Sequence, residues 1–134
     1  MIDVAEVEES FERCMLKGDV VERFYALFMD SHPDIRPRFV NTDFDSQKKL
    51  LRQSIGLAIL HARNNPVGRI GINRLARSHS KSGLNIPPPL YAYWKASFIQ
   101  AVSEFDEEFS DGLNTQWDAV LQKTINDVVA GYEE

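Results

Sequence analysis

Apolar residues recur at intervals of three and four along almost the whole chain, and this helical periodicity constrains the fold more than any other feature. No segment shows the strict alternation of apolar and polar residues that is typical of a half-buried strand. The sequence therefore predicts an all-α fold in one domain that spans residues 1–134. The expected helices, of unequal length, cover about 4–17, 20–28, 45–61, 69–80, 90–105 and 111–128.

Glycine, proline and capping residues mark the expected helix ends. Asp19 is placed to cap the second helix, and Ser110 or Asp111 to cap the last one. Val4, Val7, Phe11 and Met15 share the apolar face of the first helix, which Gly18 is placed to end. Further along the chain, "PDIRPRF" predicts a short turn and "NNPVG" predicts a loop. The run of three prolines opens the next helix, "LYAYWKASFIQAVSEF".

Composition excludes several classes of function. The net charge of -5 and the pI of about 5.2 argue against a nucleic-acid partner, because that function needs a basic surface, and we expect no clustered basic side chains. No apolar run approaches the ~20 residues of a membrane span. Cys14 is the one cysteine, so an internal disulfide is excluded and we expect a buried thiol in a cytoplasmic protein.

A single histidine on an apolar helix face is the most informative residue. Ile72, Leu75, Ala76 and His79 stand at i, i+3, i+4 and i+7, so His79 shares the apolar side. Such an imidazole either bonds to a backbone carbonyl in the core or binds a ligand. Haem iron needs only one strong protein ligand, whereas zinc and non-haem iron need further ligands for which the spacing is absent.

Other residues supply what a haem site requires. Gln47 and Leu51 lie at i and i+4 on the long helix, Phe39 ends the short turn, and Tyr25 lies on the helix before it. Core packing or simple exposure explains each of these residues taken alone. Their combination with His79 favours haem.

At this point the chain resembles a known family, the bacterial single-domain globins, and is similar to the globin domain of flavohaemoglobins. The resemblance covers nearly the whole chain and implies globin packing of about six to seven helices around a haem b pocket. It is carried by the order and spacing of "FYALFMDSHPDIRPRF", "SQKKLL", "LARSH", "IPPPLYAYW" and the tryptophan of "NTQWDAVL".

The resemblance implies a role for individual residues. His79 would be the proximal ligand to the iron, and Phe39 would pack flat on the haem. Tyr25 and Gln47 would face the bound gas and carry any catalysis, with Leu51 above the iron. The other residues that it places at the cofactor are Phe44, Lys48, Ile86, Tyr91 and Trp94.

Two departures from the flavohaemoglobin pattern concern the proximal side. The segment between His79 and Tyr91 is longer than in that pattern, and the family's proximal carboxylate would correspond to Glu134. Two roles are open for the amine of Lys48. It is solvated or bound to a haem propionate, or it is a sixth ligand to the iron when no gas is present.

The resemblance implies reversible binding of O2, CO and NO. It also implies NO dioxygenation to nitrate, for which we expect a separate reductase, because no flavin or nicotinamide domain follows residue 134. One alternative is a haem-based gas or redox sensor, or a regulatory subunit, that acts through a partner protein. Another is a haem-free globin module that acts by protein contact alone. A monomer and a homodimer both remain open.

Overall fold

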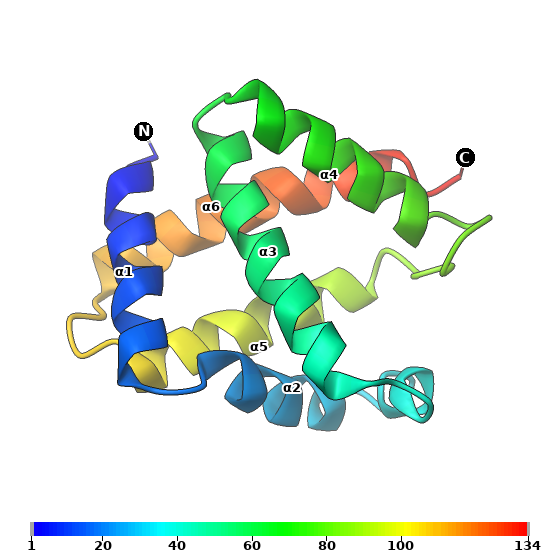
Figure 1. Ribbon diagram of the computed structural model, residues 1–134, viewed down its shortest axis with the longest axis horizontal. Coiled ribbons are helices and arrows are strands. Elements are labelled where there is room, and N and C mark those ends of the chain that lie inside the picture. Colours follow the sequence, from blue (N-terminus) through cyan, green and yellow to red (C-terminus); the bar gives the residue numbers. More distant parts are fainter. Residues whose placement is uncertain (1, 134) are drawn as a thin grey trace.

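The computed structural model describes residues 2–133 and is helical nearly throughout (Figure 1). No strand occurs in this described range, which confirms the expected all-α class. The elements are α1 (Val4–Lys17), α2 (Val20–Ser31), the 3-10 helix η1 (Arg36–Phe39), α3 (Phe44–Ala62), α4 (Pro66–His79), α5 (Leu90–Phe105) and α6 (Asp111–Ala130).

Side-chain caps and glycine set the helix ends largely where the sequence predicts them. The carboxylate of Asp19 accepts a hydrogen bond from the Glu22 amide at 2.9 Å and begins α2. Gly18 ends α1, and its amide donates to the Cys14 carbonyl at 3.3 Å. Ser110 begins α6 by accepting from the Leu113 amide at 3.1 Å.

Two expectations about helices are wrong. The segment "NNPVG" is not all loop, because α4 already begins at Pro66, with Asn65 as its cap. Proline is well suited to the first helical position, where its missing N–H is not needed. On α1, Met15 is 44% exposed, and the fully buried Cys14 takes the inner position instead. The expectation of a buried thiol at Cys14 is confirmed.

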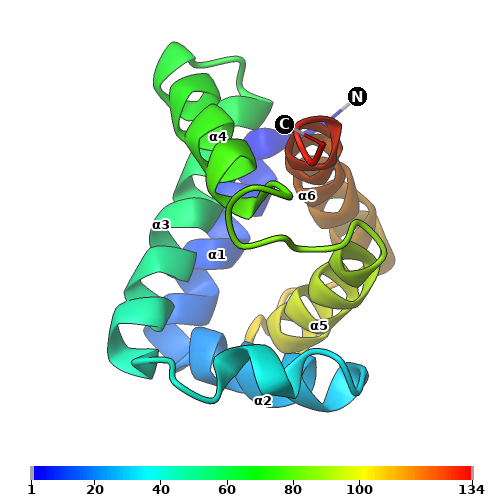
Figure 2. The same ribbon diagram turned by 90° about the vertical axis from the view of Figure 1, so that its right-hand side faces the viewer.

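Figure 2 shows how the helices are arranged around the α4–α5 connection, residues 80–89. In this view α3 and α4 lie on one side, α5 and α6 lie on the other, and α2 runs across the bottom. The contacts show that α3 packs on α4, α2 packs on α5 and α5 packs on α6, and that α4 also packs on α6. Residues 80–89 thus pass from the side of α3 and α4 to the side of α5 and α6.

Helices α3 and α4 touch backbone to backbone at a glycine. A Cβ atom added to Gly68 would lie 2.4 Å from the His61 amide nitrogen, and one added to Gly71 would lie 2.6 Å from Leu57 Cδ2. Real Cβ atoms do not approach other atoms this closely. The distance between the two helices thus depends on residues without side chains.

The core is aromatic and lies between α1, α2, α5 and α6. Phe24, Phe98 and Trp117 are completely buried. The ring centroids of Phe24 and Phe98 are 5.6 Å apart, and those of Phe98 and Trp117 are 5.5 Å apart. Contacts of this kind contribute roughly 0.5–1.5 kcal/mol per pair beyond their buried area.

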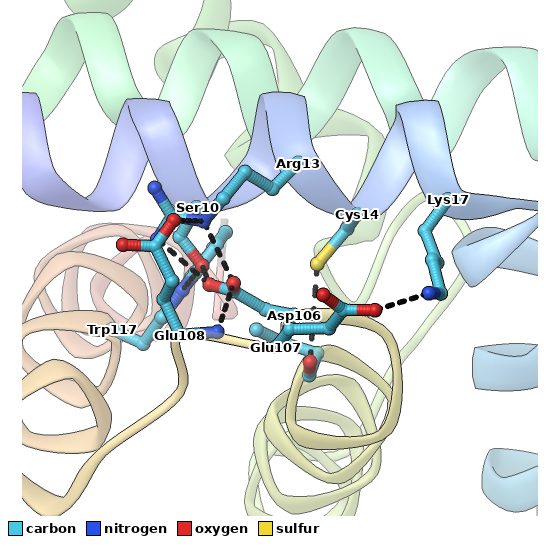
Figure 3. Close-up of polar contacts among 9 residues, drawn as sticks. Ser10, Arg13, Cys14, Lys17, Asp106, Glu107, Glu108 and Trp117 are labelled. Atoms are coloured by element: carbon cyan, nitrogen blue, oxygen red, sulfur yellow. Dashed lines mark hydrogen bonds and ion pairs between the residues drawn. The ribbon is translucent and has the colours of Figure 1, made fainter.

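A buried polar cluster, here called the Asp106 network, joins α1, α6 and the residue that follows α5 (Figure 3). Asp106 accepts hydrogen bonds from the Ser10 hydroxyl at 2.6 Å and from Arg13 Nε at 2.7 Å. The Trp117 indole N–H donates to the Ser10 oxygen at 2.9 Å, and the Glu108 amide donates to Asp106 at 3.0 Å. Burial raises the pKa of Asp106, but the bonds from Arg13 and Ser10 outweigh it and hold that pKa below its usual value.

Candidate functional site

His79 is the last residue of α4, and its ring is oriented by its own helix. The Nδ1 atom lies 2.9 Å from the Leu75 carbonyl and 3.0 Å from the Ser78 hydroxyl. Because a carbonyl can only accept, we assign the ring proton to Nδ1, which leaves a lone pair on Nε2. Within residues 2–133 the Nε2 atom has no hydrogen-bond partner.

Burial keeps His79 neutral. It lowers the pKa of the imidazole, and the Leu75 carbonyl opposes that effect only in part. A neutral imidazole whose Nδ1–H is bound to a backbone carbonyl is the form in which histidine binds a metal through Nε2. The local geometry of α4 therefore leaves His79 Nε2 with a lone pair that can bind a metal.

Tyr25 and Gln47 meet although they come from different helices. Gln47, near the start of α3, donates from Nε2 to the Tyr25 hydroxyl oxygen at 3.1 Å. Tyr25 lies on α2 and is 5% exposed. Burial raises its pKa to about 12, with the Gln47 hydrogen bond opposing, so the hydroxyl keeps its proton near neutral pH. That proton has no acceptor among the described residues.

Aromatic rings surround this pair. The ring centroid of Tyr25 lies 5.8 Å from that of Phe39, at the end of η1, and 5.6 Å from that of Phe44, at the start of α3. Phe39 and Phe44 are themselves 5.9 Å apart. Leu51 follows Gln47 by one helical turn and is 6% exposed. The structure thus brings five of the predicted site residues onto one wall.

Three further predicted residues lie on the α4–α5 connection and α5. The Ile86 amide donates to the His79 carbonyl at 3.2 Å, so Ile86 stays beside the end of α4. Trp94 is half-buried and stacks on Phe98 with centroids 6.1 Å apart. Burial raises the pKa of Tyr91 to about 12, and the nearby Arg38 opposes the rise.

The side chain of Lys48 is held by an ion pair. The amine of Lys48 pairs with the Asp19 carboxylate at 3.2 Å, at the cap of α2, and would have to leave this partner to reach an iron. Glu134 lies outside the described residues.

Asn85 is a residue of this region that the sequence reading missed. Its backbone adopts a positive φ of 53°, which asparagine tolerates better than most residues. Its side-chain oxygen accepts from the Tyr132 hydroxyl at 2.6 Å, and its carbonyl accepts from Arg38 at 3.2 Å. These bonds hold the α4–α5 connection to η1 and to the end of the chain. The only local signal was the residue type.

The donor set fits haem rather than a bare metal ion. In residues 2–133 no three His, Cys, Asp or Glu side chains come together as metal ligands. Haem brings four nitrogen ligands of its own and takes one imidazole from the protein, which is what His79 offers.

None of the described helices is long and apolar enough to span a membrane.

Comparison with known proteins gives one strong match. No protein-family model and no curated protein sequence matches the chain. A crystal structure of a Pseudomonas aeruginosa PAO1 protein, named as structurally highly homologous to a human haemoglobin, superposes with a TM-score of 0.93. The two sequences are 30% identical, and the match covers 98% of each chain. The likeness therefore includes every helix described above.

Proposed function

This chain belongs to the globin family, as a bacterial-type single-domain globin, and from that premise we propose that it binds haem b with His79 as the iron ligand. The single observation that carries the proposal is the His79 ring itself. Its Nδ1 is held by the Leu75 carbonyl while Nε2 has no partner within residues 2–133. The globin fold supplies the helices around it, and the chain supplies the ligand.

Haem held by one imidazole reversibly binds O2, CO and NO. The chain's own contribution is an apolar and aromatic enclosure that excludes water from that ligand. We assign this enclosure to the predicted cofactor residues Phe39, Phe44, Leu51, Ile86, Tyr91 and Trp94. In such an environment a hydrogen bond to a partly charged ligand is stronger than in water.

Tyr25 and Gln47 supply that hydrogen bond. Because Gln47 donates to the Tyr25 oxygen, the orientation of the phenol is fixed and its proton remains available to a ligand. The raised pKa of Tyr25, about 12, keeps this proton in place. The pair supports slow O2 release and high O2 affinity.

We extend the proposal to the conversion of NO to nitrate. In that reaction NO, O2 and one electron give nitrate, so each turnover consumes one electron from a separate reductase. Tyr25 and Gln47 support it, because a donor that retains O2 lengthens the time available for NO to react. The enzymatic role therefore depends on an electron donor, whereas gas binding does not.

Absorption spectra of the purified protein test the haem proposal. The ferric, reduced and CO-bound forms should show a strong Soret band that shifts with CO and is lost in His79→Ala. His32→Ala is the matched control, since His32 lies at the end of α2 and bonds through Nδ1 to the Asp34 amide at 3.0 Å. Absence of a Soret band after haem titration of the wild type would overturn the proposal. O2-dependent consumption of NO by the reduced protein then tests the enzymatic extension.

A further inference from the structure

Charge is strongly segregated along this chain. Residues 46–103 contain nine Lys or Arg and no Asp or Glu, whereas the flanking segments hold all 20 Asp and Glu and the other six Lys and Arg. The net charge of -5 conceals this division. The expectation that basic side chains are not clustered is therefore wrong.

Folding neutralises part of the basic segment but not α4. Four of its cations pair with acids from the flanking segments: Lys48 with Asp19 at 3.2 Å, Arg63 with Glu8 at 2.9 Å, Lys81 with Glu133 at 3.9 Å and Lys95 with Asp118 at 2.8 Å. In contrast, Arg69, Arg74 and Arg77 on α4 are exposed and form no ion pair within residues 2–133. Three arginines without an ion pair within residues 2–133 thus lie on one helix, α4.

The outward side of α4 combines these arginines with exposed apolar residues. Val67 and Ile70 are 61% and 55% exposed, and the helical period places Arg74 and Arg77 on the same side. We call these four residues the α4 outer face. Exposed aliphatic residues bordered by arginine are typical of protein–protein interfaces, in which arginine is enriched and lysine is depleted.

We propose that the α4 outer face docks an acidic protein that donates electrons to the haem. The inference rests on the proposed function, because His79 lies on the opposite side of this same helix. A helix with its side chains is about 10–12 Å across, so a docked partner comes close to the ligand site. The donor would supply one electron for each haem iron that it reduces from the ferric to the ferrous state.

Arginine chemistry favours a protein over a lipid surface. Guanidinium groups form bidentate hydrogen bonds with carboxylates, which gives geometric specificity as well as attraction. Helices that lie on membranes bury a wide face with Trp, Phe or Leu, whereas the apolar part of the α4 outer face consists of Val67 and Ile70 alone.

The test uses the reduced form of an acidic plant-type [2Fe–2S] ferredoxin as the probe donor. Reduction of the ferric protein is followed by stopped-flow absorption for the wild type and for Arg74→Gln/Arg77→Gln. Electrostatically steered association should slow about tenfold in this variant at low salt, and the wild-type rate should fall as salt rises. Reduction by dithionite should be the same in both proteins.

A second double variant controls for net charge. Lys17→Gln/Arg36→Gln removes the same two charges, but these residues pair with Glu107 and Asp30 away from α4. Its rate with ferredoxin should stay within about twofold of wild type. Equal slowing in both double variants would overturn the proposal, since net charge rather than the α4 outer face would then be responsible.

Contact itself is measured separately from electron transfer. Backbone amide resonances of α4 in the CO-bound protein should shift when oxidised ferredoxin is added. Shifts confined to other helices, or binding to phosphatidylserine vesicles without binding to ferredoxin, would overturn the proposal. Reversible self-association of the wild type that the arginine variant abolishes would also overturn it, in favour of a second copy. If the wild type shows no Soret band, the proposed function fails, and the same titration of the haem-free chain still decides whether α4 docks the acidic protein.

Discussion

The Asp106 network and the residues proposed to bind haem and its ligand use their hydrogen-bonding capacity in opposite ways. The Asp106 carboxylate accepts four hydrogen bonds, from Ser10, two nitrogens of Arg13 and the Glu108 amide. Among the residues proposed to bind haem and its ligand, His79 Nε2 and the Tyr25 hydroxyl proton have no partner within residues 2–133.

The difference separates stability from function. An unsatisfied polar atom in a buried position costs about 1–3 kcal/mol, so a cluster that serves the fold alone is expected to be closed. The lone pair of His79 and the proton of Tyr25 fit the ligand site proposed above. Four predictions follow from this contrast, in order of decreasing effect.

Removing the carboxylate of the Asp106 network should have the largest effect on stability. Asp106→Ala leaves Arg13, Ser10 and the Trp117 N–H short of partners, which should lower the free energy of unfolding by about 3 kcal/mol. We take the lower end of the range for a broken buried ion pair, because the Arg13 side chain is 29% exposed and water can replace part of the loss. Urea unfolding followed by circular dichroism measures the change. The exposed neighbour Glu107→Ala is the control, and an equal loss there would contradict the contrast.

Haem binding should have the next largest effect on the free energy of unfolding. Haem at about 100 times its dissociation constant should raise the free energy of unfolding of the wild type by about 2.7 kcal/mol. His79→Ala should lose this increment, whereas Asp106→Ala should keep it on a less stable background. Urea unfolding with and without haem measures both. Equal stabilisation of His79→Ala by haem would show that the imidazole is not the ligand.

Removing the reserved proton should affect ligand release. Tyr25→Phe should raise the O2 dissociation rate tenfold or more, about 1.4 kcal/mol, the scale of one hydrogen bond to a charged group. Gln47→Ala should have a smaller effect, because Gln47 acts in part by orienting Tyr25. Displacement of O2 by CO in stopped flow gives the rates. Tyr93→Phe serves as control, since Tyr93 is 38% exposed. An unchanged rate in Tyr25→Phe would place the phenol away from the ligand.

Acid should weaken the haem-free protein slightly through His79. Burial lowers the folded-state pKa of this imidazole below its usual 6.5, so the unfolded chain takes up the proton first. Above pH 6.5 His79 is neutral in both states and the free energy of unfolding is unaffected. As pH falls from 6.5 toward the folded-state pKa, proton uptake by the unfolded chain lowers the free energy of unfolding. Urea unfolding at pH 7.5 and 5.5 should show a smaller difference for His79→Gln than for the wild type. If only His32→Gln reduced the difference between the two pH values, His32 rather than His79 would be responsible, and the prediction would be wrong.

Local sequence signals predicted most of the fold. Helical periodicity and the caps at Asp19, Gly18 and Ser110 act over a few residues, so a sequence shows them directly. The start of α4 at Pro66 could not be predicted, because a proline that begins a helix looks the same in sequence as one that lies in a loop. At Met15 and Cys14 the period allowed either residue to face inward, and packing decided between them.

The site was only partly predictable. The position of His79 follows from the period of its helix, whereas the roles of Tyr25 and Gln47 came through a family resemblance. The Asp106 network had no signal, because Ser10 bonds to partners 96 and 107 residues away. The charge segregation of residues 46–103 was visible in the sequence but was masked by reading net charge alone.

The backbone contact at Gly68 has a mechanical consequence for the ligand site. Gly68 is near the first residue of α4 and His79 is the last, so about 16 Å of rigid helix separates them at 1.5 Å per residue. An alanine at Gly68 would push α4 off the His61 backbone and tilt the whole rod. A tilt of a few degrees at that pivot moves the far end by about an ångström. The missing methyl group of Gly68 thus helps to set the position of the His79 imidazole at the other end of α4.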